Sequence, residues 1–196
     1  VPLKGGRGEA LKLLASLPKN YDKVRNDPNQ SNSQLSPYNK FGCLSIREFF
    51  HASREEALTR QLYWRDFYYH ICVMNGGYES FQKKYRDLKW ENNPKYLQAW
   101  KEGKTGTPIV DAAMRCLATT GIMHNRLRMI VASYLTKDLL IDWKEGEKHF
   151  AHYLVDYDPA QNNGGWVTAS NNTAMGIINW NWSTTLLPYL QPRTSK

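Results

Sequence analysis

The spacing of hydrophobic residues along this chain predicts helices over most of its length and few strands. Leucines recur at helical intervals within residues 8–17, so a short helix is expected there. Residues 26–39 are polar and rich in turn-forming types, and they predict a loop. Ser45, with Glu48 three positions later, has the pattern of a capping box and marks the start of another helix. A long helical pattern follows over residues 55–74.

The second half of the chain continues the helical pattern. Thr107 followed by Pro108 is typical of an N-cap and a first helical residue, and this helix is expected to end at Gly121. A further helix is expected over residues 125–140. The helix after it is defined by two capping acids and three apolar residues, namely Asp142, Glu145, Phe150, Tyr153 and Leu154. Because strand-like alternation is scarce, the expected fold class is mainly α, with helices packed at several angles around a site.

Residues 167–196 differ in composition from the rest of the chain. They contain no Asp or Glu, and their only charged side chains are Arg193 and Lys196. Ser, Thr and Asn dominate, and the hydrophobic residues among them follow no clear period. The chain is therefore expected to divide into a helical domain over residues 1–166 and a divergent, poorly ordered tail over residues 167–196.

The charge and the aromatic content narrow the choice of partners. The formal net charge is +8, which favours a polyanionic partner such as nucleic acid, although many basic proteins bind none. Aromatic residues make up 13% of the chain, with seven Trp and twelve Tyr. Such a content suits stacking on flat rings, and it equally suits the filling of a helical core.

The cysteines indicate the type of environment. Cys43, Cys72 and Cys116 lie far apart, and none belongs to a C-x-x-C pair. This argues against a disulfide framework or a zinc site and favours reduced, buried thiols in an intracellular protein of the cytoplasm or nucleus. No apolar run is long enough to cross a membrane, and no signal peptide is visible, so neither a membrane protein nor a secreted one is expected.

Four side chains of the long helix, at spacings of three and four, are expected to share one face. They are an amide, an indole, a guanidinium and a phenol, from Gln61, Trp64, Arg65 and Tyr68. Such a surface suits a flat ring that carries a phosphate, because the indole stacks and the arginine neutralises charge. The same pattern fits an amphipathic helix with Trp64 in the core, and this segment alone leaves both interpretations open.

Two further polar groups are candidates for binding. Asn125 and Arg128 place an amide and a guanidinium near a helix start, where they can bind a conjugated ring or an anion, but surface polarity is the simpler interpretation of this pair alone. Asp156, Tyr157 and Asp158, with the amide-rich segment after them, can bind a polar heterocycle or a ribose, or serve only as a turn and a cap. No metal site is expected, because no histidine or third acid lies at ligand spacing.

Four segments together resemble the FAD-binding domain of the DNA photolyase/cryptochrome family. They are LSPYNKFGCLS at residues 35–45, QLYWRDFYYH at 61–70, the long block from QAWKEG to GEKHF at 98–150, and LVDYDPAQNNGGW at 154–166. The block at 98–150 is highly specific. Its MHNR sequence, in place of a His-His pair, resembles the cyclobutane-dimer photolyases more than the (6-4) enzymes.

The resemblance implies a role for each matching residue in binding FAD. Tyr21 and the loop of residues 32–36 would hold the phosphates, and Asn162 would lie near N5 of the flavin. The full set implied to bind the cofactor is Tyr21, Asn32, Ser33, Gln34, Leu35, Ser36, Arg65, Asn125, Arg128, Asp156, Tyr157, Asp158 and Asn162.

The resemblance also implies contacts with damaged DNA and a path for electrons. Trp64 would stack on a flipped pyrimidine dimer, and Gln61 stands where the dimer-repairing enzymes usually carry a glutamate. The residues implied to contact DNA are Arg25, Gln61, Trp64, Tyr68 and Arg126. Those implied in catalysis are Gln61, Trp64 and Asn125, with Trp90, Trp143 and Trp166 as the tryptophan chain that passes electrons to photoexcited flavin, although three core tryptophans would explain the last three equally well without the family.

The implied activity is that of a deoxyribodipyrimidine photolyase, a carbon–carbon lyase that works as a monomer and uses blue light and reduced FAD to split the dimer. Four departures from the family pattern bear on this expectation. The N-terminal α/β antenna domain of the family is expected to be absent, and Gln61 replaces the usual acid. Val167 and Thr168 stand where the family usually has Gln and a second Trp, and Gln34 replaces a common Arg. Two alternatives therefore stay open: a cryptochrome-like photoreceptor, and an inactive DNA-binding remnant without flavin.

Overall fold

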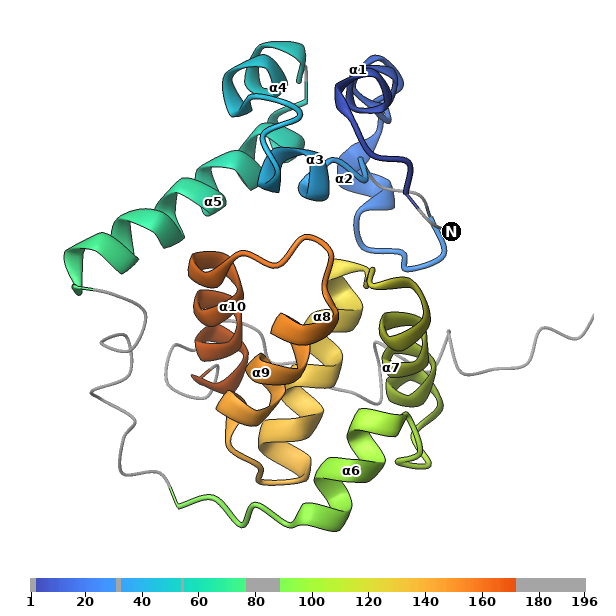
Figure 1. Ribbon diagram of the computed structural model, residues 1–196, viewed down its shortest axis with the longest axis vertical. Coiled ribbons are helices and arrows are strands. Elements are labelled where there is room, and N and C mark those ends of the chain that lie inside the picture. The colour runs from blue at the N-terminus through green and yellow to red at the C-terminus, as the bar shows by residue number, and fades with distance from the viewer. Residues whose placement is uncertain (1–2, 31–32, 54, 77–88, 172–196) are drawn as a thin grey trace, which may run out of the picture.

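The computed structural model describes residues 3–30, 33–53, 55–76 and 89–171, and within these ranges it contains helices and no strand (Figure 1). This confirms the mainly α fold class. The elements are α1 (Arg7–Ala15), α2 (Tyr21–Val24), α3 (Ser36–Lys40), α4 (Ile46–Ala52), α5 (Glu56–Met74), α6 (Pro94–Glu102), α7 (Pro108–Thr120), α8 (Asn125–Ser133), the π-helical turn η2 (Tyr134–Asp138), α9 (Trp143–Tyr153) and α10 (Pro159–Asn171).

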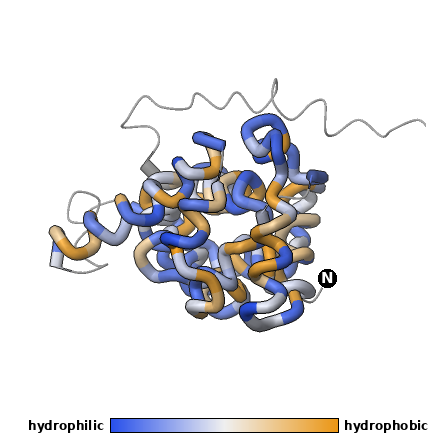
Figure 2. Tube along the Cα trace, turned by 90° about the horizontal axis from the view of Figure 1, so that it is seen from above, coloured by the Kyte–Doolittle hydropathy of each residue, from blue (hydrophilic) through white to orange (hydrophobic). Residues whose placement is uncertain are grey.

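The helices form two layers, each with its own hydrophobic core. Helices α1–α5 make the upper layer in Figure 1, and helices α6–α10 make a bundle below it. The core of the upper layer centres on Leu35, Leu44 and Phe49, whereas that of the bundle includes the fully buried Trp100 and Leu135. Apolar and polar stretches alternate along the chain (Figure 2), as expected for helices that bury one face and expose the other.

Local signals in the sequence set several helix ends. The hydroxyl of Ser45 accepts a hydrogen bond from the backbone N–H of Arg47 at 3.1 Å, and Glu48 accepts from the backbone N–H of Ser45 at 3.0 Å, which confirms the capping box. Helix α7 ends before Gly121, whose φ of 68° is left-handed. A Cβ at Gly121 would lie 2.7 Å from Cγ1 of Val155, so close packing also favours glycine here.

Two expected elements differ from those in the structure. The loop predicted over residues 26–39 ends earlier, because Ser36 opens α3 and Pro37 fits the first turn of a helix. The single helix predicted over residues 125–140 is instead α8 followed by η2. There the backbone N–H of Leu139 bonds to the carbonyl of Tyr134, five residues back, at 3.1 Å.

One finer expectation, about the cap of α9, is also wrong. Asp142 caps α9 by accepting from the backbone N–H of Lys144 at 3.0 Å, but Glu145 does not complete the cap. The backbone N–H of Asp142 donates to Asn92 at 2.8 Å, and Glu145 pairs with Lys148 at 3.0 Å.

The three cysteines are free, as expected, but they are not all buried. Cys72 is buried, Cys43 is half-buried and Cys116 is exposed, its thiol lying 3.6 Å from the carbonyl of Ile122. Within the described ranges, no group of histidine, cysteine and acidic side chains could hold a metal ion. None of the described helices is long and apolar enough to cross a bilayer.

Helix α10 continues past Trp166 to Asn171, so the predicted domain boundary falls within a helix. Residues 172–196 lie outside the described residues, and the division of the chain at residue 166 stays a prediction. Helix α6 was not predicted. Its signals were present, because Asn93 accepts from two backbone N–H groups at the start and Gly103 is left-handed at the end.

Candidate functional site

The two layers meet where α5 crosses α10 (Figure 1). The ring of Tyr68 rests on Gly164, where a Cβ would lie 2.2 Å from Cδ1 of the tyrosine. The hydroxyls of Tyr68 and Thr168 are 3.4 Å apart. Only a glycine at position 164 allows this approach, and the middle of α5 is thereby fixed against the middle of α10.

Asp158 links the two layers from a buried position, with 6% of its surface exposed. Its carboxylate accepts a hydrogen bond from the hydroxyl of Tyr69 on α5. The ammonium of Lys40 on α3 lies 3.8 Å away. The second carboxylate oxygen accepts from the backbone N–H of Gln161 at 3.1 Å and so caps α10. One side chain therefore positions three helices.

Asp156 makes a second connection between the layers. Both of its oxygens accept from Nη2 of Arg128, at 3.0 and 2.9 Å, and Oδ2 also accepts from the hydroxyl of Ser36 at 2.6 Å. The Nε of Arg128 donates to the carbonyl of Met123 at 2.9 Å, which fixes the plane of the guanidinium. A serine, an arginine and an aspartate that the sequence analysis selected separately thus form one chain of hydrogen bonds.

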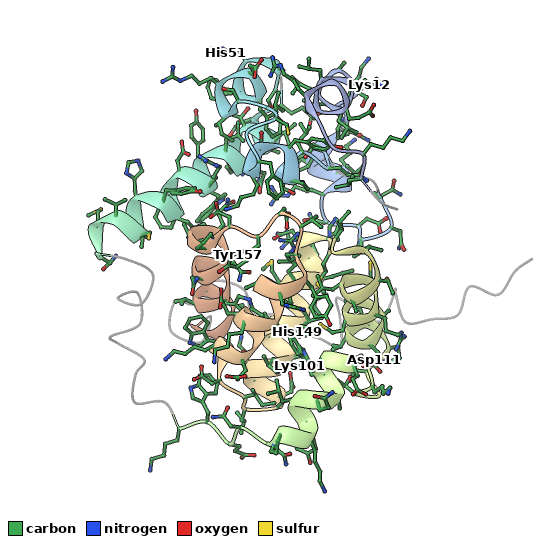
Figure 3. All side chains as sticks on the ribbon, viewed as in Figure 1. Lys12, His51, Lys101, Asp111, His149 and Tyr157 are labelled. Carbon is green, nitrogen blue, oxygen red and sulfur yellow. The ribbon has the colours of Figure 1, made fainter. Side chains whose placement is uncertain are left out.

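The sequence analysis missed Glu147, which organises the amide-rich segment. Its Oε1 accepts from the hydroxyl of Tyr157 at 2.9 Å and from the side-chain amides of Asn162 at 3.1 Å and Asn163 at 3.5 Å. The amide nitrogen of Asn162 is therefore turned towards Glu147, which leaves its oxygen free to face another group. Figure 3 shows Tyr157 near the level where the two layers meet.

An aromatic surface lies on α5 beside this junction. Trp64 is 50% exposed, so the interpretation that placed it in the core is wrong. Its ring is tilted by 31° against Tyr68, with 6.1 Å between ring centroids, and it meets the edge of Phe67 at 5.5 Å. Gln61 donates its amide to the carbonyl of Ala57 at 2.9 Å, which leaves the amide oxygen available.

Arg65 does not join the surface of Trp64 and Tyr68 that the sequence analysis expected it to share. Its guanidinium pairs with Asp66 at 2.8 Å and lies over the ring of Tyr69, 4.7 Å from the centroid. Because the hydroxyl of Tyr69 bonds to Asp158, Arg65 packs on a side chain that links the two layers.

Positive charge is concentrated where the end of α2 lies against the start of α8. Arg126 donates through Nε and Nη2 to Oδ1 of Asn26, at 2.9 and 2.5 Å. The Nη1 of Arg25 is buried and makes no hydrogen bond within the described part of the chain. Burial raises the pKa of the Tyr21 phenol, and the nearby charges of Arg25 and Arg126 oppose that rise. Burial, followed by the charge of Arg126, lowers the pKa of His124.

Several other predicted residues lie apart from the connections at the junction. Asn125 is exposed, and its amide nitrogen lies 4.0 Å from Sδ of Met129, whereas Arg128 bonds to Asp156. In the predicted phosphate loop, Asn32 lies outside the described residues, Ser33 is half-buried, and Gln34 is exposed with a φ of 51°. Leu35 is fully buried in the upper core, so only its backbone is available to a ligand.

The tryptophans chosen for electron transfer all pack in the core of the bundle. Trp143 and Trp166 are buried, and Trp90 is partly buried. The ring neighbours of Trp166 include Phe150, at 5.0 Å between centroids, and Trp100, at 6.2 Å. Trp100 was not selected from the sequence. The role of the three predicted tryptophans as an electron path stays a prediction.

The two helical layers and the polar links between them define a class of helical domain with a polar site at the junction of its layers. Comparison with known proteins identifies the family. Residues 58–193, more than half of the chain, match the family model described as the FAD binding domain of DNA photolyase. The chain therefore belongs to the DNA photolyase family. The match extends beyond residue 166, where the resemblance read from the sequence stopped.

Individual relatives agree with this assignment. A protein of Alkalihalophilus pseudofirmus named deoxyribodipyrimidine photo-lyase is 43% identical over 181 residues, which are 85% of this chain and 38% of the relative. A protein of the same name from Escherichia coli K12 is 46% identical over 166 residues, or 77% of this chain and 35% of the relative. The chain thus spans little more than a third of the length of these relatives.

Solved structures give the same result. The archaeal photolyase from Sulfolobus tokodaii with two FAD molecules has a TM-score of 0.81 and 44% identity, over 86% of this chain and 40% of that one. The cryptochrome of Synechocystis sp. PCC6803 has a TM-score of 0.77 and 30% identity, over 87% of this chain and 40% of that one. A photolyase and a cryptochrome therefore both share this fold.

The side chains at the junction fit FAD in their chemistry. Arg128, Asp156 and Ser36 present donors and acceptors suited to the polar edge of a flavin ring. The buried Nη1 of Arg25 and the buried Oδ1 of Asn39 have no hydrogen-bond partner among the described residues. A phosphate oxygen would satisfy the former, and a ligand hydroxyl or N–H would satisfy the latter.

Proposed function

We propose that this chain is the flavin-binding and lesion-binding part of an enzyme that repairs cyclobutane pyrimidine dimers in DNA with blue light. The observation that carries the proposal is the exposed Trp64 on α5, directly beside the junction where Asp156 and Asp158 tie the layers together. Trp64 is grouped with the exposed Phe67 and with Tyr68, and such an aromatic patch is typical of a binding surface, on which a flipped pyrimidine dimer can stack.

The residues of the junction would hold the cofactor by complementary hydrogen bonds. Arg128 and Asp156 would bind the flavin edge, Ser36 and Tyr21 would lie on its phosphate side, and Asn162, with its orientation set by Glu147, would turn its amide oxygen towards the ring. When bound in its reduced form, FAD supplies one electron after absorbing blue light and recovers it once the dimer is split. The protein supplies orientation and the exclusion of water.

The DNA would be held by charge and by stacking. Arg25, at the end of α2, and Arg126, in α8, lie close to one another and would neutralise backbone phosphates, consistent with the net charge of +8. Trp64, backed by Tyr68, would stack on the dimer, and the free amide oxygen of Gln61 would accept a hydrogen bond from a dimer N–H. The neutral amide oxygen gives a weaker contact than the charged carboxylate of a glutamate.

The test is repair of a dimer-containing oligonucleotide by the FAD-loaded chain under blue light, measured by chromatography of the products. Trp64→Ala should weaken binding of the damaged strand by roughly tenfold, the value of one lost base-stacking contact. Tyr63→Ala is the matched control, because Tyr63 is a 59% exposed aromatic residue of the same helix that contacts Phe50 instead. Equal losses in the two variants, or no turnover in light, would contradict the proposal.

A cryptochrome-like photoreceptor is the alternative that a specific observation favours. Thr168 stands where a second stacking tryptophan is expected, and its hydroxyl is engaged by Tyr68 and by the carbonyl of Gly164 at 2.8 Å. The lesion surface would then consist of one indole. Light-driven reduction of bound flavin without any repair of dimers would support this alternative over the enzyme.

A further inference from the structure

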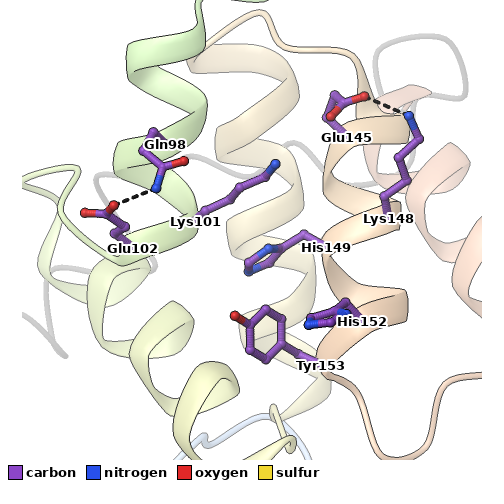
Figure 4. Close-up of a pocket in the computed structure, with 8 residues that line it drawn as sticks. All are labelled: Gln98, Lys101, Glu102, Glu145, Lys148, His149, His152 and Tyr153. Carbon is purple, nitrogen blue, oxygen red and sulfur yellow. Dashed lines mark hydrogen bonds and ion pairs between the residues drawn. The ribbon is translucent and has the colours of Figure 1, made fainter.

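A second polar pocket lies in the lower bundle, between α6 and α9, away from the junction of the layers (Figure 1). It has a volume of about 400 Å³. Figure 4 shows the side chains of both helices converging on it. The pocket is lined by Gln98, Lys101, Glu102, Glu145, Lys148, His149, His152 and Tyr153.

Lys101 is the cation that gives this pocket its charge. Its side chain extends from α6 towards α9 (Figure 4), and within the described chain no carboxylate lies at ion-pair distance from it. The two acids of the lining are already engaged. Glu102 pairs with Lys104 at 2.7 Å and accepts from Gln98 at 2.6 Å, and Glu145 pairs with Lys148 at 3.0 Å.

Three rings on α9 form the other wall. Tyr153 lies against His149 at 4.7 Å between centroids and against His152 at 4.9 Å. Trp100, fully buried, supports His149 from below at 5.5 Å and is itself held by a hydrogen bond from its Nε1 to the carbonyl of Val131. The wall is therefore anchored to the core of the bundle.

His149 carries an unmet hydrogen-bonding group. Its Nε2 is buried and has no partner among the described residues, although an imidazole nitrogen normally makes a hydrogen bond when it is removed from water. Burial, and then the neighbouring charges of Lys101 and His152, lower the pKa of His149 to about 4. The lining thus holds two lysines and two glutamates, and of these four Lys101 is the one for which the described chain provides no ion pair.

We propose that this pocket binds the phosphate group of a small molecule, and that its physiological form is a mononucleotide. An ammonium, imidazole N–H groups and a phenol hydroxyl approach from two helices, which suits the several acceptor oxygens of a tetrahedral anion better than the two of a carboxylate. Inorganic phosphate alone is much smaller than the pocket. The exposed ring of His152 and the half-buried ring of Tyr153 offer surfaces on which a base can stack.

This site is separate from the proposed function. None of its lining residues belongs to the set expected to bind FAD or DNA, and Figure 3 places His149 and Lys101 lower in the bundle than Tyr157 at the junction. Binding can therefore be measured on the chain without flavin, and its failure would leave the photolyase proposal untouched.

The experiment is calorimetric titration of the 196-residue chain at pH 7.5 with inorganic phosphate, AMP, adenosine and a short DNA duplex. AMP should bind more tightly than phosphate, and adenosine should bind at least tenfold more weakly than AMP. AMP and phosphate of equal affinity would assign the site to free phosphate, which keeps the anion site but removes the nucleotide. Binding of adenosine as tight as that of AMP, binding of DNA alone, or no binding, would overturn the proposal.

Variants locate the site. Lys101→Ala should weaken AMP binding about tenfold or more, as expected for loss of a charged hydrogen bond. Lys95→Ala is the matched control, because Lys95 is an exposed lysine of the same helix outside the pocket, and it should change the affinity less than twofold. Equal effects of the two would show that only overall charge matters and would overturn the assignment.

Histidine NMR gives an independent readout. A bound phosphate stabilises the protonated imidazole, so saturating AMP should raise the pKa of His149 above its value of about 4 in the free protein. An unchanged titration of His149 in the presence of bound AMP would place the ligand elsewhere.

Discussion

At the scale of single residues, Glu147 is the acceptor on which the amide-rich segment depends. Glu147→Ala would leave the hydroxyl of Tyr157 and the amide of Asn162 without their partner. We expect a loss of about 1–3 kcal/mol in the free energy of unfolding, the usual cost of unpaired polar groups in a partly buried site. Urea denaturation measures this loss.

Glu147→Gln provides the control for this prediction. A glutamine keeps one acceptor oxygen at nearly the same place, so it should recover most of the lost stability. If the alanine and glutamine variants unfold at the same urea concentration, the hydrogen bonds to Glu147 do not stabilise the fold.

His149 should make the protein sensitive to mild acid. Its pKa is lowered from 6.5 to about 4 in the folded chain, so the unfolded chain binds more protons between these values. As far as His149 contributes, the free energy of unfolding is highest above pH 6.5, where the imidazole is neutral in both states. It falls as the pH falls towards 4, because the unfolded chain gains a proton that the folded chain does not bind. His149→Phe removes the titration and keeps a ring against Trp100, so its stability should fall less over this interval. Parallel profiles for the two proteins, measured by denaturation at successive pH values, would refute this account.

Residue types predicted much of the site but not its connections. Asp156, Asp158 and Arg128 were selected from the sequence because acids and a guanidinium suit a polar ligand, and the structure shows each of them linking elements. Glu147 had no such signal, because its partners lie 10 to 16 residues away and only the fold brings them together. Leu35 was selected by its place in a motif, whereas its side chain belongs to the core.

At the scale of helices, the crossing of α5 and α10 depends on the absence of a side chain at Gly164. Gly164→Ala would place its Cβ 2.2 Å from the ring of Tyr68 and push the helices apart. We expect a loss of about 1–3 kcal/mol in the free energy of unfolding, as for other overpacked contacts. Thermal and urea unfolding would both report it.

The adjacent Gly165 provides a matched control. A Cβ there meets nothing within 4 Å, so Gly165→Ala should stabilise the helix by up to about 1 kcal/mol through helix propensity alone. Destabilisation by both substitutions would mean that α10 tolerates no side chain in this turn for a reason other than Tyr68.

Helices with strong local signals were predictable, and those shaped by their neighbours were not. The capping box at Ser45 and the glycine end at Gly121 each act within a few residues, and both were found from the sequence. The π-helical turn η2 contains no proline or glycine that would have predicted a break in the α-helix. The buried side chains of Leu135 and Thr136 show that packing into the bundle accompanies the change of period.

At the scale of the whole molecule, FAD should hold the two layers together. A ligand that binds only the folded chain raises the free energy of unfolding by about 2.7 kcal/mol at a concentration of 100 Kd. We therefore expect a clear rise in melting temperature with FAD and a smaller one with riboflavin, which lacks the phosphates and the adenine. Equal shifts would mean that Tyr21 and the phosphate loop make no contact with the cofactor.

The layered arrangement itself was only partly predictable. Periodicity gave the mainly α class, but nothing in the spacing of residues along the chain indicated that α1–α5 would form a separate layer with its own core. The placement of this layer against the bundle rests on contacts between distant segments, such as Ser36 with Asp156 and Asn26 with Arg126. The resemblance to a family supplied the site residues that local physics could not.

These distant contacts have a consequence for the order of folding. Ser36 and Asp156 are separated by 120 residues, and Tyr69 and Asp158 by 89, whereas the helices of the bundle mostly contact their neighbours in sequence. Closing a long loop costs chain entropy before the contact that offsets this cost has formed, so such pairings form slowly. The upper layer leaves the ribosome before the bundle and must wait for the last described helix before its lower face is covered. Until then that face stays uncovered in the nascent chain, and it is where we expect a chaperone to bind.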